Sequence, residues 1–228
     1  MGSAFTKKIA GSKASFGQNY GKEGRYWIIF NSGKMDRHSG SGVEQVIFEG
    51  SVIRIVDPGP PIGSRFKPSK GGNDAPHTPC DPFTFYYSAS MTGSEGRCKR
   101  LLLVATNMTE AQLPAAILPA TGQACAPGTP GAVDPIEFAI EQATSPSTNA
   151  LKDIVIEVTG RGMRTQGRGP AGPQDIIAVD PVRRVWAREV HENWEGLHEN
   201  VKQMLMRDKR LELMLQREER ERSMVGAK

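Results

Sequence analysis

A long, charged and amphipathic segment near the C-terminus, from about Pro181 to Met224, is the feature that most restricts how this chain can fold. Its apolar residues recur at alternating spacings of four and three, the pattern of a helix with one apolar stripe. The stripe consists of Val190, Trp194, Leu197, Val201, Met204, Leu211 and Leu215, with Asp208 at the one interrupted position. Such a stripe needs a cover, either the rest of the chain or a second helix, and the sequence leaves both arrangements open.

Asp180 and Pro181 are a suitable cap and first-turn pair for this helix, because aspartate accepts from free backbone amides and proline tolerates the first turn. The segment from Pro181 to Lys228 carries eleven basic and nine acidic residues. This near balance is unfavourable for an arm that binds nucleic acid. We therefore predict that residues 181–228 form one amphipathic helix that serves packing or oligomerisation.

The rest of the chain contains five segments with the β-branched and aromatic composition of strands. They span residues 25–35, 43–56, 82–91, 151–159 and 174–179. Helices are predicted between the third and fourth strands, over residues 96–107, 109–112 and 134–143. The apolar run from Leu101 to Val104 fits either a helix or a strand, and we favour the helix. Asp134 and Pro135 again provide a cap and a first turn.

Three strands, a helical insert and two further strands follow one another in the order of the OB-fold. We expect a mainly β protein with helices, in which residues 20–180 form a small antiparallel OB-like barrel. Residues 1–19 are rich in Gly, Ser and Lys and are predicted to be a flexible or docking arm. Residues 181–228 then form the C-terminal helix.

Glycine and proline, 25 and 16 residues in number, gather in stretches that predict long loops. These loops cover residues 57–82, 119–135 and 160–173. Residues 1–70 hold eleven Lys or Arg against five Asp or Glu, so the positive excess lies in the first third of the chain. A local basic surface suits a polyanion such as nucleic acid, and it also fits an ordinary solvated surface.

The motifs of the common enzyme classes are missing, since the sequence contains no GxGxxG, Walker loop, HExxH or GxSxG. Cys80, Cys98 and Cys125 form no CxxC pattern, and the four histidines lack a second ligand at metal-site spacing. We therefore expect a protein that is not an enzyme and has no metal or cofactor. No apolar run reaches the length of a membrane span, so we expect a cytoplasmic protein without a membrane partner.

Several segments resemble small phage-encoded proteins of the OB type that are related to single-stranded-DNA-binding proteins. The resemblance begins with Gly17-Gln18-Asn19-Tyr20 through Gly24-Arg25-Tyr26-Trp27 and continues over residues 42–55. It extends over residues 96–107, where such proteins carry a helix between strands three and four, and over residues 152–165. Many single-strand binders end in an acidic tail, whereas this chain ends in a segment of mixed charge.

The resemblance and the basic first third together suggest a non-catalytic, phage-type protein that binds single-stranded nucleic acid, with single-stranded DNA as its partner. On such a fold a basic groove follows the phosphates, and aromatic side chains stack on the bases. The candidate binding residues are Tyr26, Trp27, Phe30, Lys34, Arg37, Arg54, Arg65 and Lys67. For Trp27 and Phe30, a place in the core is the alternative.

A second hypothesis is a virion structural or assembly protein, of the decoration or connector type, built on the same barrel. The long loops, the N-terminal arm and the C-terminal helix are the parts that neighbouring subunits can hold. The helix would then mediate self-association or bind another phage protein. The first hypothesis places the protein in the host cytoplasm, and the second places it in the virion.

Overall fold

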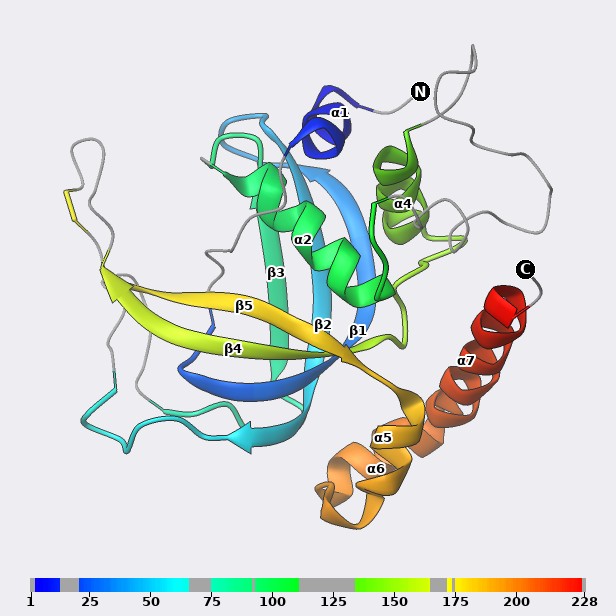
Figure 1. Cartoon of the computed structure of the whole chain (residues 1–228). Helices are drawn as coiled ribbons and strands as arrows, with labels where there is room; N and C mark the ends of the chain where they lie inside the picture. Colours follow the sequence, from blue (N-terminus) through cyan, green and yellow to red (C-terminus); the bar gives the residue numbers. More distant parts are fainter. Residues whose placement is uncertain are drawn as a thin grey trace.

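The computed structural model describes residues 3–12, 21–65, 75–91, 93–110, 134–164, 172–173 and 175–226, which form an antiparallel sheet with helices on both faces (Figure 1). The strands are β1 (Gly24–Arg37), β2 (Glu44–Asp57), β3 (Pro82–Ser88), β4 (Val155–Arg164) and β5 (Asp175–Val185). The helices are α1 (Ala4–Gly11), α2 (Ser94–Thr106), α4 (Pro135–Thr144), α5 (Ala187–Glu192), the 3-10 turn η1 (Trp194–Gly196), α6 (Glu199–Arg207) and α7 (Arg210–Gly226).

The strands lie in the order β3-β2-β1-β4-β5, so β3 and β5 are the two edges of the sheet. Among the described residues no pairing joins these edges, and the sheet is not closed into a barrel. The predicted closed barrel is therefore wrong, and the fold is a mixed α/β one. Helix α2 gives the physical reason, because it contacts both β3 and β5 and buries Leu101 and Leu102 in the core.

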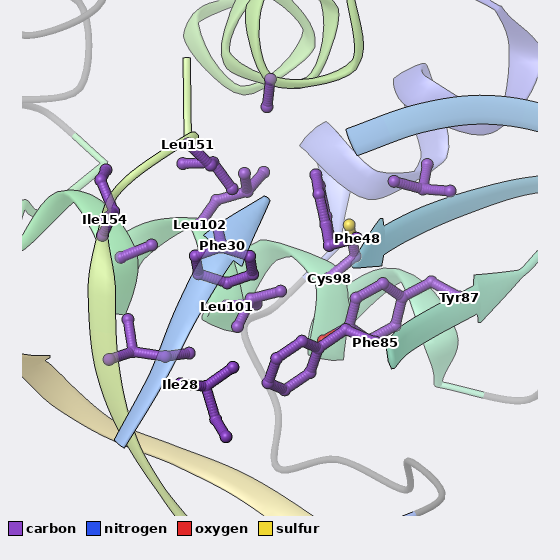
Figure 2. Packing of buried hydrophobic residues seen from close by; sticks show 14 of the residues in the cluster. Ile28, Phe30, Phe48, Phe85, Tyr87, Cys98, Leu101, Leu102, Leu151 and Ile154 are labelled. Atoms are coloured by element: carbon purple, nitrogen blue, oxygen red, sulfur yellow. The ribbon is translucent and has the colours of Figure 1, made fainter. Parts of the chain in front are cut away.

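Helices α1, α2 and α4 cover one face of the sheet, which we call the inner face (Figure 1). Their apolar side chains form one cluster with those of all five strands, and Figure 2 shows part of it, including Phe30, Phe48 and Leu102. The predicted helix over residues 96–107 is confirmed as α2. The predicted cap of α4 is also confirmed, since Oδ1 of Asp134 accepts from the backbone amide of Ile136 at 2.8 Å.

Strand β1 is buried on both faces over its first half. Tyr26, Ile28 and Phe30 belong to the inner cluster, whereas Trp27 and Ile29 belong to a second cluster on the opposite, outer face. Successive side chains of a strand point to opposite faces, so an unbroken apolar run is what a strand covered on both sides requires. The run from Tyr26 to Phe30 is thus a consequence of burial.

Helix α1 lies within the segment that was predicted to be a flexible or docking arm. Its Phe5 and Ile9 are fully buried in the inner cluster. The backbone amide of Phe5 donates to Glu44 Oε2 at 3.2 Å, and Nζ of Lys99 donates to the carbonyl of Ala10 at 2.9 Å. Residues 4–11 are therefore a docked helix, not a flexible arm.

The predicted single C-terminal helix is wrong in two respects. Strand β5 continues through Asp180 and Pro181 to Val185, so these two residues pair with β4 and do not start a helix. The helical part is then divided into α5, α6 and α7 with turns between them. Asp208 forms the C-cap of α6, and Lys209 has a φ of 51°. The polar residue that interrupts the apolar stripe therefore marks a break between two helices.

The apolar stripe packs within the same chain on the outer face of the sheet. Val190, Leu197 and Val201 are buried in the outer cluster together with Trp27 and Ile29. The remaining stripe residues, Trp194, Met204, Leu211 and Leu215, are partly buried against this cluster. The stripe thus finds its cover in cis, which the sequence had left open.

Arg210, at the start of α7, ties the C-terminal helices to the middle of the sheet. Its buried guanidinium lies 2.5 Å from Asp153 Oδ1, measured from Nε. Nη1 donates to the side-chain oxygen of Asn31 at 2.9 Å, and Nη2 donates to the carbonyl of Phe30 at 2.8 Å. The strand pairing between β1 and β2 shifts at this point, and the Phe30 carbonyl accepts from both Arg210 and the Asp153 backbone amide.

We expect Arg210→Ala to lower the free energy of unfolding by roughly 3 to 5 kcal/mol, because it leaves the nearly buried Asp153 carboxylate without its cation. Denaturant unfolding followed by circular dichroism measures this loss. Arg207→Ala, which removes an exposed arginine from α6, is the matched control and should change stability by at most about 0.5 kcal/mol. Equal losses in the two variants would contradict the anchoring role.

Candidate nucleic-acid interface

Four arginines on the outer face come from four different strands and surround the accessible edge of the outer cluster. We call them the arginine surface: Arg25 on β1, Arg54 on β2, Arg161 on β4 and Arg183 on β5. Register places them on one face, since Trp27 pairs with both Arg54 and Glu157, and Glu157 pairs with Arg183. The sheet therefore gathers cations that lie far apart in the sequence.

Glu157 holds two of these arginines from beneath. Its carboxylate lies 2.8 Å from Arg25 Nε and 3.2 Å from Arg183 Nε, and it accepts from the Trp27 indole at 3.3 Å. The Glu157 side chain is only 7% exposed, whereas those of Arg25 and Arg183 are 50% and 43% exposed. The carboxylate lies inside and the guanidinium groups lie outside.

Arg161 repeats this layering on the β4–β5 hairpin. Its Nη2 lies 3.4 Å from Asp180 Oδ2, with the arginine side chain 66% exposed and the aspartate 16% exposed. A guanidinium has five N–H donors, so one such contact leaves most of them available. The inner carboxylates fix the positions of the arginines, so an incoming anion would meet guanidinium groups first. Arg183 is the exception, because its Nη1 also lies 2.8 Å from Oε2 of Glu189, whose side chain is 30% exposed.

Arg54 completes the arginine surface and is held by its neighbours. Its guanidinium lies over the Trp27 ring at 4.6 Å from the centroid and donates to the side-chain oxygen of Asn193. These contacts join β2 to the C-terminal helices and leave Arg54 partly exposed. Of the predicted binding residues, Arg54 is therefore the one that the fold brings into this surface.

A second accessible region lies farther along the outer face, on β1, β2 and β3. Lys34, Ile47 and Tyr86 stand opposite one another in the strand register, and we call this row the tyrosine platform. Ile47 belongs to neither apolar cluster but is itself buried, with 9% of its surface exposed, whereas the Tyr86 side chain is partly exposed. The Tyr86 hydroxyl donates to Gln45 Oε1, and Lys34 Nζ lies 3.5 Å from Glu49 Oε1. The predicted residue Lys34 thus lies in one row with Tyr86, an aromatic residue that was not predicted, and Ile47 stands between them.

The three aromatic residues predicted to stack on bases do not occupy accessible positions. Tyr26 and Phe30 are fully buried in the inner core, and Trp27 is buried beneath the arginine surface. Helices cover both faces of this part of β1, and that leaves no ring open to a ligand. The alternative of a core role is the one that the structure supports for Trp27 and Phe30.

The remaining predicted residues are scattered. Arg37 is exposed at the end of β1, and its Nη2 lies 3.9 Å from Glu44 Oε1. Arg65 is buried and donates to the backbone carbonyls of Glu23 and Pro58, which is a structural role. Lys67 lies outside the described residues.

Sequence reasoning missed Arg25, Arg161, Arg183 and Tyr86. For Tyr86 the signal was present, because the alternation along β3 places Phe85 and Tyr87 inside and therefore Tyr86 outside. Arg183 could not be found, since its segment was predicted to be helical. The two remaining arginines depend on the pairing of β1 with β4, which a sequence pattern does not reveal.

His77 lies at the end of the sheet near Arg65, buried among aromatic rings. Its ring centroid is 5.0 Å from that of Tyr26 and 5.2 Å from that of Phe83, and Nδ1 lies 3.6 Å from Asp81 Oδ2. Burial, and then the positive charge of Lys22, lower the pKa of His77 to about 4. No cluster of three or more metal-ligating side chains occurs within the described ranges.

No protein-family model matches the sequence, and neither a curated protein nor a solved structure matches this chain. None of the helices in the described part of the chain combines the length and the apolar character that crossing a membrane requires. The candidate interface therefore rests on the geometry of the chain itself.

We expect the stability to fall as the pH is lowered from about 6.5 to about 4, because His77 takes up a proton more readily in the unfolded state than in its buried site. The loss attributable to this group is roughly 3 kcal/mol over that range. Denaturant unfolding at several pH values measures it. His77→Leu, which cannot titrate, should show a shallower pH dependence, and an unchanged slope would argue against this assignment.

Proposed function

We propose that this protein binds single-stranded nucleic acid, with phosphates on the arginine surface and a base against Tyr86. The observation that carries the proposal is the layering of charge, in which exposed arginines stand over buried carboxylates. Phosphate contacts of this kind position a strand without reading its sequence. Arginine suits the task, because its planar fork can donate two parallel hydrogen bonds to one phosphate.

A single strand fits this surface better than a duplex does. Stacking on Tyr86 requires a base whose face is free, and base-paired nucleotides in a duplex do not offer one. The exposed Lys34 adds a cation in the same row, with the buried Ile47 between it and Tyr86. The tyrosine platform can thus take a base while the arginine surface neutralises the backbone.

The order of the elements supports the same proposal. Strands β1, β2 and β3 follow one another, α2 stands between β3 and β4, and the β4–β5 hairpin pairs back onto β1. We interpret this as an open variant of the OB barrel, which binds oligonucleotides on its second and third strands and on the loops after the first and fourth strands. Ile47 and Tyr86 lie on β2 and β3, and Arg161 lies on the β4–β5 hairpin. We propose single-stranded DNA as the partner of this phage-type protein.

An assembly role in a virion is the second candidate. The observation that favours it is an apolar groove on the C-terminal helices, lined in part by Trp194, Leu205 and Met206. Such a groove suits a contact between protein subunits. Mass spectrometry of purified particles would find the protein there if this role is correct.

We expect Arg25→Gln and Arg161→Gln each to weaken binding to a long single-stranded oligonucleotide, roughly threefold to tenfold at moderate salt. Each should also reduce the slope of log affinity against log salt by about 0.7, since one phosphate contact is lost. Fluorescence anisotropy at a series of salt concentrations measures both quantities. Arg220→Gln, an exposed arginine of α7 away from this surface, is the control. Absence of binding by the unaltered protein at low salt would refute the proposed function.

We expect Tyr86→Ala to weaken oligonucleotide binding by roughly 1 to 3 kcal/mol, because the stacking surface is removed. Tyr86→Phe keeps the ring and should bind almost as the unaltered protein does. The same titration measures both variants, with a thermal melt of each as a check on folding. If phenylalanine weakened binding as much as alanine, the hydroxyl group and not the ring would be the contact.

A further inference from the structure

A groove with a volume of about 340 Å³ lies where the C-terminal helices meet. We call it the elbow groove, and it is lined by His191, Trp194, Leu205, Met206, Lys209, Leu211 and Glu212. Its apolar side chains come from η1, α6 and α7, on both sides of the break at Lys209. The charged residues Lys209 and Glu212 also line it.

The elbow groove shares Trp194 and Leu211 with the apolar stripe that packs on the sheet. That stripe is already covered in cis, yet Met206 remains 56% exposed and Leu213, one turn beyond the break, remains 46% exposed. In the described residues only four large apolar side chains are this exposed, and two of them flank the α6–α7 break. Apolar surface that gathers beside a groove is typical of a contact site.

The charges around the break are balanced and partly unused. Within the described part of the chain, Lys209 makes no ion pair, and Glu212 accepts only from the Gln216 side chain, at 3.1 Å. The two opposite charges stand three residues apart. This surface carries a cation, an anion, an exposed apolar side chain and an apolar groove. Two copies of such a surface can therefore be complementary to each other.

We propose that the elbow groove binds a second copy of this chain, in a two-fold arrangement. Met206 of each copy enters the groove of the other, and Lys209 of each copy faces Glu212 of the other. In a two-fold interface the same patch serves on both sides, so complementary features must lie next to one another on one surface, as they do here. The balanced charge does not favour an anionic membrane or a nucleic acid at this site. The inference is independent of the nucleic-acid function proposed above.

Sedimentation of the full chain over a wide concentration range tests the proposal. We expect a reversible dimer, and we expect Met206→Glu to raise its Kd at least about tenfold, because a charge replaces the inserted side chain. Ile62→Glu changes an aliphatic residue that is more exposed than Met206 and far from the groove in sequence, and it should leave the Kd unchanged. Oligonucleotide binding by the Met206→Glu variant to a single site should persist, which separates dimerisation from nucleic-acid binding.

Charge-reversal variants test whether Lys209 of one copy pairs with Glu212 of the other. Lys209→Glu and Glu212→Lys should each weaken the dimer about tenfold, and the double variant should recover it, since the two opposite charges are exchanged. A protein that stays monomeric at every concentration would overturn the proposal, and so would a dimer that is indifferent to Met206→Glu. Failure of the double variant to recover the dimer would overturn the pairing of Lys209 with Glu212. A monomer that binds only a different protein would show that the groove serves another partner.

Discussion

Burial of strand β1 on both faces is the constraint on which the rest of the structure depends. Its inner side chains need the cover of α1, α2 and α4, and its outer side chains need the cover of the C-terminal helices. The C-terminal helices pack on Trp27 and Ile29 and leave other parts of the outer face accessible. The arginine surface and the tyrosine platform both lie in these uncovered parts. The location of the candidate interface is therefore set by what the core requires.

The arginine surface is coupled to the outer core through one residue. Glu157 accepts from the Trp27 indole and at the same time holds Arg25 and Arg183. Trp27 in turn lies beneath Arg54 and packs with the apolar side chains of the C-terminal helices. A buried carboxylate of this kind needs its cations, because an unpaired charge in the interior is costly. The arginines are thus held near the surface even without a ligand.

The sequence was informative where structure is local and misleading where it depends on distant segments. The five strands, helix α2 and the Asp134 cap were predicted, since composition and capping chemistry act within a few residues. The closed barrel was not found, because α2 takes the place between β3 and β5 that a strand pairing would occupy. Because of the apolar periodicity after Pro181, a helix was predicted where β5 in fact continues to Val185. Only the Asp208 interruption signalled the break between α6 and α7.

The candidate site shows the same limit. Lys34 and Arg54 were predicted and lie in accessible regions, since long basic side chains rarely remain inside a core. The aromatic residues of β1 were misjudged, because helices from distant segments bury them: α1, α2 and α4 cover Tyr26 and Phe30, and the C-terminal helices, encoded more than 150 residues later, cover Trp27. Residues such as Arg161 become candidates only when the pairing of strands is known. Functional residues on a sheet face are therefore harder to predict than the strands that carry them.

The contacts of Arg210 with Phe30, Asn31 and Asp153 have a consequence for folding during synthesis, because α7 is translated after the strands that it contacts. All five strands leave the ribosome before the helices that cover their outer face. Until α5, α6 and α7 have been synthesised, Trp27 and Ile29 lack the helical side chains that bury them. A chain that stops at that stage exposes an apolar surface next to four arginines. Chaperones bind exposed apolar surfaces of this kind. Synthesis of the C-terminal helices is thus also the step that covers the apolar side chains of the outer face and lowers the risk of aggregation.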